Sequence, residues 1–227
     1  MGGINVKMHT IGVLSDTHGL LREEVLAALN GCDAILHGGD INRQEILDRL
    51  EEIAPVHVVR GNNDKDWAEH LPVFLDISLF GLAIYMTHKK KDLPKDLSRY
   101  DLVVYGHSHR YSQATVGDTL FLNPGSCGPR RFNQEITMAL VTVSDDGHIQ
   151  ELKRIDIPHA KPAPALSPKR DLKQDISQVM QYVDKGKPVP EIAEELRMDP
   201  DLAEQICRLY LTHPGVSADG IMAKMGL

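Results

Sequence analysis

Residues 10–64 read TIGVLSDTHGLLREEVLAALNGCDAILHGGDINRQEILDRLEEIAPVHVVRGNND. Apolar runs rich in valine and isoleucine alternate along this stretch with patterns of helical period. The runs that we interpret as strands are residues 10–15, 34–37 and 56–60, and the helical patterns between them are 21–29 and 43–52. The order strand, helix, strand, helix, strand is typical of a parallel sheet covered by helices. This stretch therefore predicts an α/β fold.

The chain beyond residue 64 consists of short segments rich in β-forming residues. They are residues 74–80, 82–87, 102–105, 113–116, 120–122, 136–143 and 148–157. Gly81 separates the first two segments as a hairpin turn would, and Asp145-Asp146-Gly147 is a strong hairpin signal between the last two. We therefore expect an α/β sandwich of two β-sheets with flanking helices, with its loops gathered at one end.

Five short polar strings follow the apolar runs. They are Asp16-Thr17-His18, Gly39-Asp40, Gly61-Asn62-Asn63-Asp64, Thr87-His88 and Gly106-His107-Ser108-His109. Residues two apart in an extended segment point the same way, so Asp16 and His18 can present ligand atoms toward one point. The same spacing relates His107 to His109. Carboxylate oxygen and imidazole nitrogen suit divalent ions such as Mn²⁺, Fe²⁺, Zn²⁺ or Ni²⁺, and the strings therefore indicate metal binding.

Each string also has a plain structural interpretation. Asp16 and Asp40 would cap the helices that follow them, and the histidines would fill core or loop positions. For any single residue that interpretation is as good as metal binding, because Asp and Asn are common capping residues. It explains five strings in succession poorly, and we therefore interpret the chain as a metal-dependent enzyme.

The ordered set Asp-x-His, Gly-Gly-Asp, Gly-Asn-x-Asp, His and Gly-His-x-His resembles the motifs of the calcineurin-like metallophosphoesterase superfamily. The short chain, with Val-Arg-Gly-Asn-x-Asp at 59–64 and Asn-Pro-Gly-Ser at 123–126, is similar to the compact bacterial and archaeal phosphodiesterase branch. The resemblance covers about residues 10–157. It implies a four-layer αββα sandwich with a dinuclear metal centre and hydrolysis of phosphodiesters, with monoesters as a further option.

The resemblance also implies a role for each matching residue. The first metal would be held by Asp16, His18, Asp40 and His109. The second metal would share Asp40 and be held further by Asn62, His88 and His107. The catalytic set would be Asp40, Asn62, Asn63 and His88, and a hydroxide shared by the metals would attack phosphorus in line. We expect two Mn²⁺ ions, with Fe²⁺, Zn²⁺, Ni²⁺ and Mg²⁺ left open.

Two departures from the family pattern concern the substrate. Asn63 stands where larger relatives carry a histidine, and an amide cannot supply a proton near neutral pH. We therefore predict a preference for good leaving groups. After His88 the chain continues with three lysines, 89–91, where relatives usually have glycine. A run of lysines is usually solvated, but Lys89, Arg130 and Asn63 are our candidates for contact with the substrate phosphate.

Two further residues or motifs are expected to support the site. Asp64 would orient Asn62 rather than bind metal itself. The Asn-Pro-Gly-Ser motif at 123–126 would form a turn that buttresses the metal loops.

Composition and charge limit the alternatives. The 227 residues carry a net charge of −7, and we count 16 basic and 22 acidic residues in 1–157 against 9 and 10 in 158–227. Neither part has the basic excess that nucleic-acid binding relies on. No apolar run approaches the roughly 20 residues of a membrane helix, and the N-terminus lacks a signal core, so we expect a cytoplasmic protein. Three isolated cysteines argue against a thiolate zinc site or a disulfide framework.

The segment after residue 157 lies outside the resemblance. We expect a metallophosphoesterase domain at 1–157, a proline-rich linker at 158–168 and a helical domain at 169–227. Its helical patterns cover residues 169–185, 190–196, 200–211 and 218–225.

Short helices joined by tight turns resemble a helix-turn-helix module. The helix that would read DNA opens with Asp201 and Glu204, and carboxylates would be repelled by phosphates. We therefore expect nucleic-acid binding to be unlikely and favour packing, homo-oligomerisation or docking of a protein partner. The enzyme would take a phosphorylated small molecule or a nucleotide, and the alternatives left open are a non-catalytic interaction scaffold of the same fold and a nucleic-acid-binding regulator.

Overall fold

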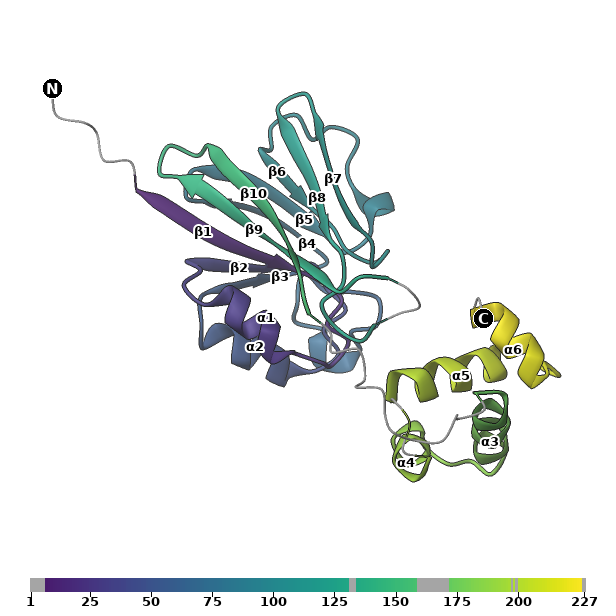
Figure 1. Cartoon of the computed structure of the whole chain (residues 1–227). Coiled ribbons are helices and arrows are strands. Elements are labelled where there is room, and N and C mark those ends of the chain that lie inside the picture. Colours follow the sequence, from purple (N-terminus) through teal and green to yellow (C-terminus); the bar gives the residue numbers. More distant parts are fainter. Residues whose placement is uncertain (1–6, 131–133, 159–171, 197, 199, 226–227) are drawn as a thin grey trace, which may run out of the picture. The chain divides into compact units, whose positions relative to one another are not determined.

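The computed structural model describes residues 7–130, 134–158, 172–196, 198 and 200–225. The chain forms two compact units, Met1–His159 and Ala160–Leu227 (Figure 1). Each unit has its own hydrophobic core. Within the described residues, no helix is both long and apolar enough to cross a bilayer.

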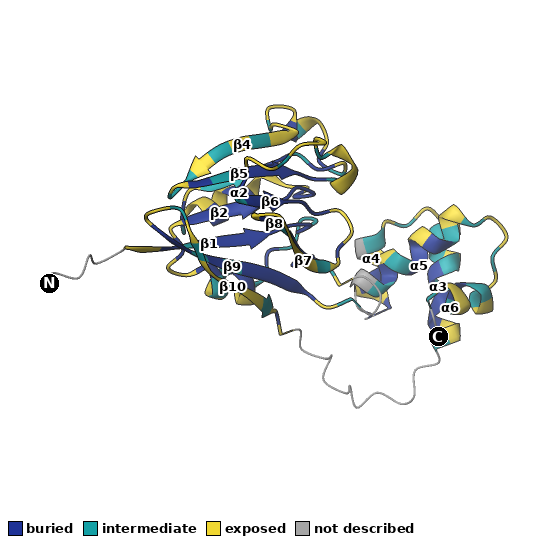
Figure 2. Cartoon of the chain, turned by 90° about the horizontal axis from the view of Figure 1, so that it is seen from above, coloured by how far each residue is buried: buried dark blue, intermediate teal, exposed yellow. Residues whose placement is uncertain are grey.

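Two five-stranded sheets face each other in the first unit. The first sheet has the order β10-β9-β1-β2-β3, and its strands are β1 (Met8–Leu14), β2 (Ala34–His37), β3 (Val56–Val58), β9 (Thr137–Ser144) and β10 (Ile149–Asp156). The second has the order β4-β5-β6-β8-β7, with β4 (Phe74–Leu79), β5 (Leu82–Thr87), β6 (Leu102–Val104), β7 (Tyr111–Val116) and β8 (Thr119–Pro124). Figure 2 shows β1, β9 and β5 buried, and β4 exposed along much of its length.

Apolar side chains hold the layers together because their burial removes them from water. Helices α1 (Glu23–Leu29) and α2 (Gln44–Glu51) lie against the first sheet (Figure 1) and pack on it through Leu29, Ile35 and Leu50. A second cluster, which includes Val13, Ile84 and Val141, combines buried residues of both sheets. The predicted two-sheet α/β sandwich with flanking helices is confirmed.

Strand direction brings the polar strings together. β1, β2 and β3 run parallel, as do β5 and β6, so the loops after their carboxyl ends meet at one edge of each sheet. Backbone hydrogen bonds then join these loops: Asp16 N–H donates to Gly39 C=O at 2.9 Å, and Gly106 N–H donates to His88 C=O at 3.0 Å.

Three antiparallel strand pairings differ in how far the sequence predicts them. The β4–β5 and β9–β10 pairs are antiparallel, as the turn signals at Gly81 and residues 145–147 predict. The return of β9 to the edge of β1, where the two strands pair antiparallel, had no local signal. Pairing across more than a hundred residues depends on which edge is left open, and no pattern within either strand specifies it.

The described part of the second unit contains four helices. They are α3 (Leu172–Asp184), α4 (Val189–Glu195), α5 (Pro200–Thr212) and α6 (Ala218–Met225). Ile176, Ile192, Ile206 and Ile221 are buried in their shared apolar core. The linker predicted at 158–168 lies, beyond Pro158, outside the described residues.

Candidate metal centre

Five of the predicted ligands have a left-handed backbone. Their φ angles are +57° for Asp16, +46° for His18, +56° for Asp40, +70° for His107 and +58° for His109. Residues other than glycine rarely adopt this conformation, and it gathers at functional sites where the surroundings enforce it. The Asp-x-His and His-x-His pairs therefore converge through tight left-handed turns, and our expectation of extended segments at these positions was wrong.

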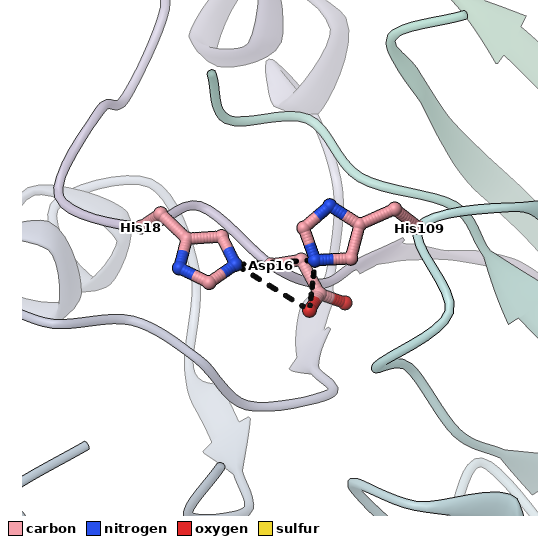
Figure 3. A group of neighbouring side chains, drawn as sticks. All are labelled: Asp16, His18 and His109. Atoms are coloured by element: carbon pink, nitrogen blue, oxygen red, sulfur yellow. Dashed lines mark hydrogen bonds and ion pairs between the residues drawn. The ribbon is translucent and has the colours of Figure 1, made fainter. Parts of the chain in front are cut away.

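The first group of candidate ligands consists of Asp16, His18 and His109 (Figure 3). The two imidazole Nε2 atoms are 3.2 Å apart. Asp16 Oδ1 lies 3.1 Å from Nε2 of His109 and 3.7 Å from Nε2 of His18. Three potential ligand atoms thus surround one point in a buried part of the protein.

The carboxylate of Asp16 is held so that one oxygen stays available. Its Oδ2 accepts hydrogen bonds from Ser15 Oγ–H at 2.6 Å and from the backbone N–H of His107 at 3.0 Å. Burial raises the pKa of Asp16, but His109 and His18 outweigh it and hold the pKa well below its usual value. Asp16 is therefore a carboxylate with Oδ1 directed at the histidines.

The second group consists of Asp40, His88 and His107, whose ligand atoms all lie within 4.8 Å of one another. His88 Nδ1–H donates to the carbonyl of Gly38 at 2.7 Å, which fixes the tautomer and turns the lone pair of Nε2 toward Asp40, 3.4 Å away. Burial lowers the pKa of His88, but the Asp40 carboxylate raises it by more, so the net shift of the pKa is upward. His107 is the exposed member of this group.

Asp40 lies between the two groups. Its Oδ2 is 3.4 Å from Nε2 of His88 and 3.7 Å from Nε2 of His18. Asn63 holds the same carboxylate twice, by its backbone N–H on Oδ1 at 2.8 Å and by its side-chain amide on Oδ2 at 2.7 Å. Burial raises the pKa of Asp40, but His88 and Asn63 outweigh it and the pKa is lowered.

Asp64 supports the loop that carries Asp40. Its carboxylate accepts the backbone N–H groups of residues 40, 41, 42 and 61 at 2.7–3.0 Å. We expected Asp64 to orient Asn62, whereas the contacts show that it fixes the backbone around Asp40. Gly61 permits this close approach, because a Cβ there would lie 2.2 Å from the backbone nitrogen of Asp40.

Buried polar atoms without partners show that the residues present fit divalent ions. Oδ1 of Asp16, Nε2 of His88 and Nδ1 of His109 are buried and make no hydrogen bond. A buried acceptor left unpaired costs about 1–3 kcal/mol, and such atoms need an explanation. Asp16 Oδ1 in the first group and His88 Nε2 in the second are thus acceptors that a divalent ion could bind. The donors are oxygen and imidazole nitrogen, which suit several divalent ions.

The remaining predicted residues differ in their placement. Asn62 is exposed in the loop after β3 and, within the described chain, its side chain makes no hydrogen bond. Lys89 is partly buried and lies close enough to His107 to contribute, after burial and His88, to the lowered pKa of that histidine. Arg130 is exposed and donates through Nε to the carbonyl of Gln134 at 3.2 Å. The described contacts do not bring Arg130 to either ligand group.

The Asn-Pro-Gly-Ser turn buttresses the metal loops, as predicted. Asn123 donates through its amide to the carbonyl of Gly106 at 2.9 Å, and Ser126 donates through Oγ to the carbonyl of Asp16 at 2.8 Å. Sequence reasoning missed two further supports, Ser15 and His37. Nε2 of buried His37 lies 3.1 Å from Oγ of Thr17, and its Nδ1 accepts the N–H of Gly39 at 3.1 Å. Their position beside the ligand strings was the one available signal.

The fold and these two groups together define a two-sheet α/β sandwich with a candidate dinuclear metal centre at the ends of its strands. The family model of the calcineurin-like phosphoesterase superfamily domain matches residues 9–146. The chain belongs to this superfamily, and the resemblance inferred from its motifs is confirmed.

Similarity to individual proteins agrees with this membership. The chain is 31% identical over 145 residues to a probable metallophosphoesterase of Methanothermobacter thermautotrophicus, a match that spans 57% of this chain and 84% of the relative. It is 27% identical over 138 residues to a phosphodiesterase of Methanocaldococcus jannaschii, with 52% and 83% covered.

Two solved structures share the fold. One is an archaeal phosphodiesterase with a TM-score of 0.53 and 23% identity, for which the match covers 65% of this chain and 99% of that one. The other is Vacuolar Protein Sorting 29 from Cryptosporidium parvum, also with a TM-score of 0.53, at 18% identity, with 66% and 98% covered. Both matches span about two thirds of this chain.

Proposed function

We propose that this chain is a divalent-metal-dependent phosphoesterase that hydrolyses phosphodiesters. The observation that carries the proposal is the pair of ligand groups around Asp40, each with a buried acceptor that has no partner. Superfamily membership and a relative named as a phosphodiesterase support the same reaction class. We propose Mn²⁺ as the metal in both groups; the oxygen and nitrogen ligands are compatible with it and equally with Fe²⁺, Zn²⁺, Ni²⁺ and Mg²⁺.

The residues have separable tasks. Two bound divalent ions would supply an acidified water and positive charge against the phosphoryl oxygens. Asp16, His18 and His109 would hold one ion, His88, His107 and Asn62 the other, and Asp40 both. Ser15 and Asn63 orient the two carboxylates through the hydrogen bonds described above.

Lys89 is proposed to meet an oxygen of the reacting phosphate. It is partly buried near His107, and within the described residues its ammonium has no hydrogen bond or ion pair. Its neighbour Lys90 instead lies over the ring of Tyr105, 5.4 Å from the centroid. An ammonium without a partner beside a phosphate site is available for a charge-assisted hydrogen bond.

The bond changes are those of hydrolysis. The oxygen of a water forms a bond to phosphorus while the bond from phosphorus to the leaving oxygen breaks, and the proton that the water gives up passes to solvent. Asn63 has no proton to give, so the leaving group departs as an anion or takes its proton from solvent. Leaving groups that are stable as anions should therefore react fastest.

Hydrolysis of bis-p-nitrophenyl phosphate by metal-reconstituted protein tests the proposal. We expect Mn²⁺-dependent release of p-nitrophenolate that Asp40→Asn and His107→Ala reduce by at least about a hundredfold, several kcal/mol of lost stabilisation. Asp48→Asn and His148→Ala are matched controls, because both side chains are exposed on the first unit away from the ligand groups. Activity that survives Asp40→Asn would contradict the two-metal assignment.

Lys89 has its own test. Lys89→Ala should raise KM for the same substrate about tenfold, the loss expected for one charge-assisted hydrogen bond. Lys91→Ala is the matched control, since Lys91 is exposed two residues further on. Equal KM values in the two variants would exclude Lys89 from the phosphate site.

A further inference from the structure

A small pocket adjoins the first ligand group. It has a volume of about 200 Å³ and is lined by His109, Arg110, Tyr111, Gln134, Glu135, Thr137 and Arg154. Pockets that hold whole small molecules usually measure about 300–1,000 Å³. This pocket therefore has room for one substituent of a substrate rather than for a whole molecule. Because His109 both lines the pocket and belongs to the first ligand group, the phosphate of that substrate would lie at the metal centre.

The two arginines that line the pocket differ in their partners. Arg154 is neutralised, since it contacts the carboxylates of Glu135 and Asp156 and lies over the ring of Tyr111, 5.1 Å from the centroid. Arg110 is exposed, and its guanidinium has no hydrogen bond or ion pair within the described chain. Of the two arginines in the lining, Arg110 is thus the one whose guanidinium has no ion-pair partner among the described residues.

The position of Arg110 adds to the argument. It follows His109 directly, and the backbone N–H of Arg110 lies 3.4 Å from Oγ of Ser108, an atom that also accepts from the Asn123 amide at 3.1 Å. The backbone from which Arg110 projects is therefore tied to the same turn that supports the metal loops. A guanidinium that projects from a well-held backbone position suits recognition of a planar or tetrahedral oxyanion.

From these features we propose that the pocket binds a second anionic group of the substrate, a carboxylate or a further phosphate, through Arg110. The inference rests on the proposed phosphodiesterase function and names its substrate class: phosphodiesters whose non-leaving substituent ends in an anion. The first unit is acidic overall, so a general attraction for anions would not produce this preference. The two proposed metal ions also attract anions, and the Arg110→Gln variant separates their contribution from that of the pocket.

Two synthetic diesters with the same leaving group test the proposal. They are p-nitrophenyl 2-carboxyethyl phosphate and p-nitrophenyl propyl phosphate, which differ in the charge of the substituent that stays on phosphorus. We expect kcat/KM to favour the carboxyethyl ester about tenfold in the wild-type protein. Arg110→Gln should bring the ratio near one, and Arg110→Lys should restore part of it.

The matched control is Arg49→Gln. Arg49 lies on α2, where it pairs with Glu23 at the surface, and the ratio should stay at its wild-type value. A p-nitrophenyl 2-phosphoethyl ester tells a phosphate from a carboxylate as the preferred anion. A wild-type ratio of one or less, or a ratio that Arg110→Gln leaves unchanged, would overturn the proposal.

Binding separates this inference from the proposed function. If neither ester is hydrolysed, the proposed function fails, and titration calorimetry of 3-phosphonopropionate and propylphosphonate still tests the pocket. The carboxylated ligand should bind about tenfold more tightly to wild-type protein and no more tightly to Arg110→Gln. Equal affinity of the two phosphonates for the wild type would contradict an anion site.

Discussion

The two units of this chain bury very different side chains. The first unit encloses a network of carboxylates, imidazoles, hydroxyls and amides at the strand ends, whereas in the described part of the second unit Asp175 is the one buried charged or polar residue. Burying polar groups is unfavourable unless each finds a partner. The first unit gathers many such groups and leaves some acceptors without a partner, as a metal site would, whereas the described part of the helical unit is organised around its own apolar core.

The largest effect on activity is expected when a buried carboxylate of the first unit is replaced, and a buried carboxylate of the second unit provides the comparison. Asp16→Asn should lower phosphodiesterase activity by at least about a thousandfold and remove one metal from the bound pair, because it deletes a ligand oxygen. Asp175→Asn, in α3 of the second unit, should change activity less than about twofold. Metal analysis and steady-state kinetics measure both. A similar loss in the two variants would mean that the units do not divide the work as we propose.

Replacement of Asp64 tests how far the candidate ligands depend on the residues that hold their loops in place. Asp64→Asn removes the charged acceptor of four backbone N–H groups, so we expect a loss of about 2–4 kcal/mol in the free energy of unfolding. Metal affinity should fall about tenfold to a hundredfold, as for other groups that hold a ligand in place. The control is Asp184→Asn in the second unit, whose carboxylate meets one exposed tyrosine hydroxyl and whose loss should stay within about 0.5 kcal/mol.

Buried His37 makes the stability of the first unit depend on pH. Burial lowers its pKa to about 4, from an ordinary value of 6.5. Between pH 6.5 and about pH 4, His37 is protonated in the unfolded chain but stays neutral in the folded protein. The free energy of unfolding therefore falls as the pH drops below 6.5. We expect metal-free protein to lose about 2 kcal/mol more than His37→Gln between about pH 7 and pH 5, measured by urea unfolding. Parallel losses in both proteins would refute this role.

Asn63→His should act on leaving groups. An imidazole can protonate an alkoxide, so alkyl esters should gain about tenfold relative to p-nitrophenyl esters, while the absolute rate falls because Asp40 loses the amide donor. A series of aryl and alkyl esters of increasing leaving-group pKa measures the dependence. If its slope is the same in both proteins, Asn63 does not set the preference.

The smallest effect is expected when the second unit is removed. A chain that ends at Pro158 keeps every strand of both sheets and all candidate ligands, so its kcat/KM should stay within about twofold of the full chain. Sedimentation of the two chains tests homo-oligomerisation through the helices, which is one of the three roles expected for this unit beside packing and partner docking. A large loss of activity on truncation would assign the helices a part in catalysis.

The strand ends illustrate what the sequence could and could not reveal. Polar strings after apolar runs were enough to select the candidate ligands, because parallel strands bring their carboxyl ends together. The turn that aims Asp16 and His18 was not foreseen, since a left-handed backbone at Asp or His is set by its surroundings rather than by residue type.

The pocket could not be foreseen at all. Its walls come from β7, β10 and the loop before β9, and these meet through the way both sheets pack and through the unannounced pairing of β9 with β1. The Asn-Pro-Gly-Ser turn, in contrast, carried a local signal and was predicted as a support. The sequence thus predicts a feature that forms within a single turn. It does not predict one that forms only when several distant elements pack together.

The left-handed ligand residues have a consequence for the history of such a chain. Each strains the backbone by about 1 kcal/mol, and glycine at any of the five positions would relieve that strain while deleting a ligand. In a protein that no longer catalyses and serves only to bind other proteins, each such replacement would stabilise the fold at no cost to function. In a chain that still uses its metal centre, selection would keep these five residues despite the strain, and this is the case we propose here.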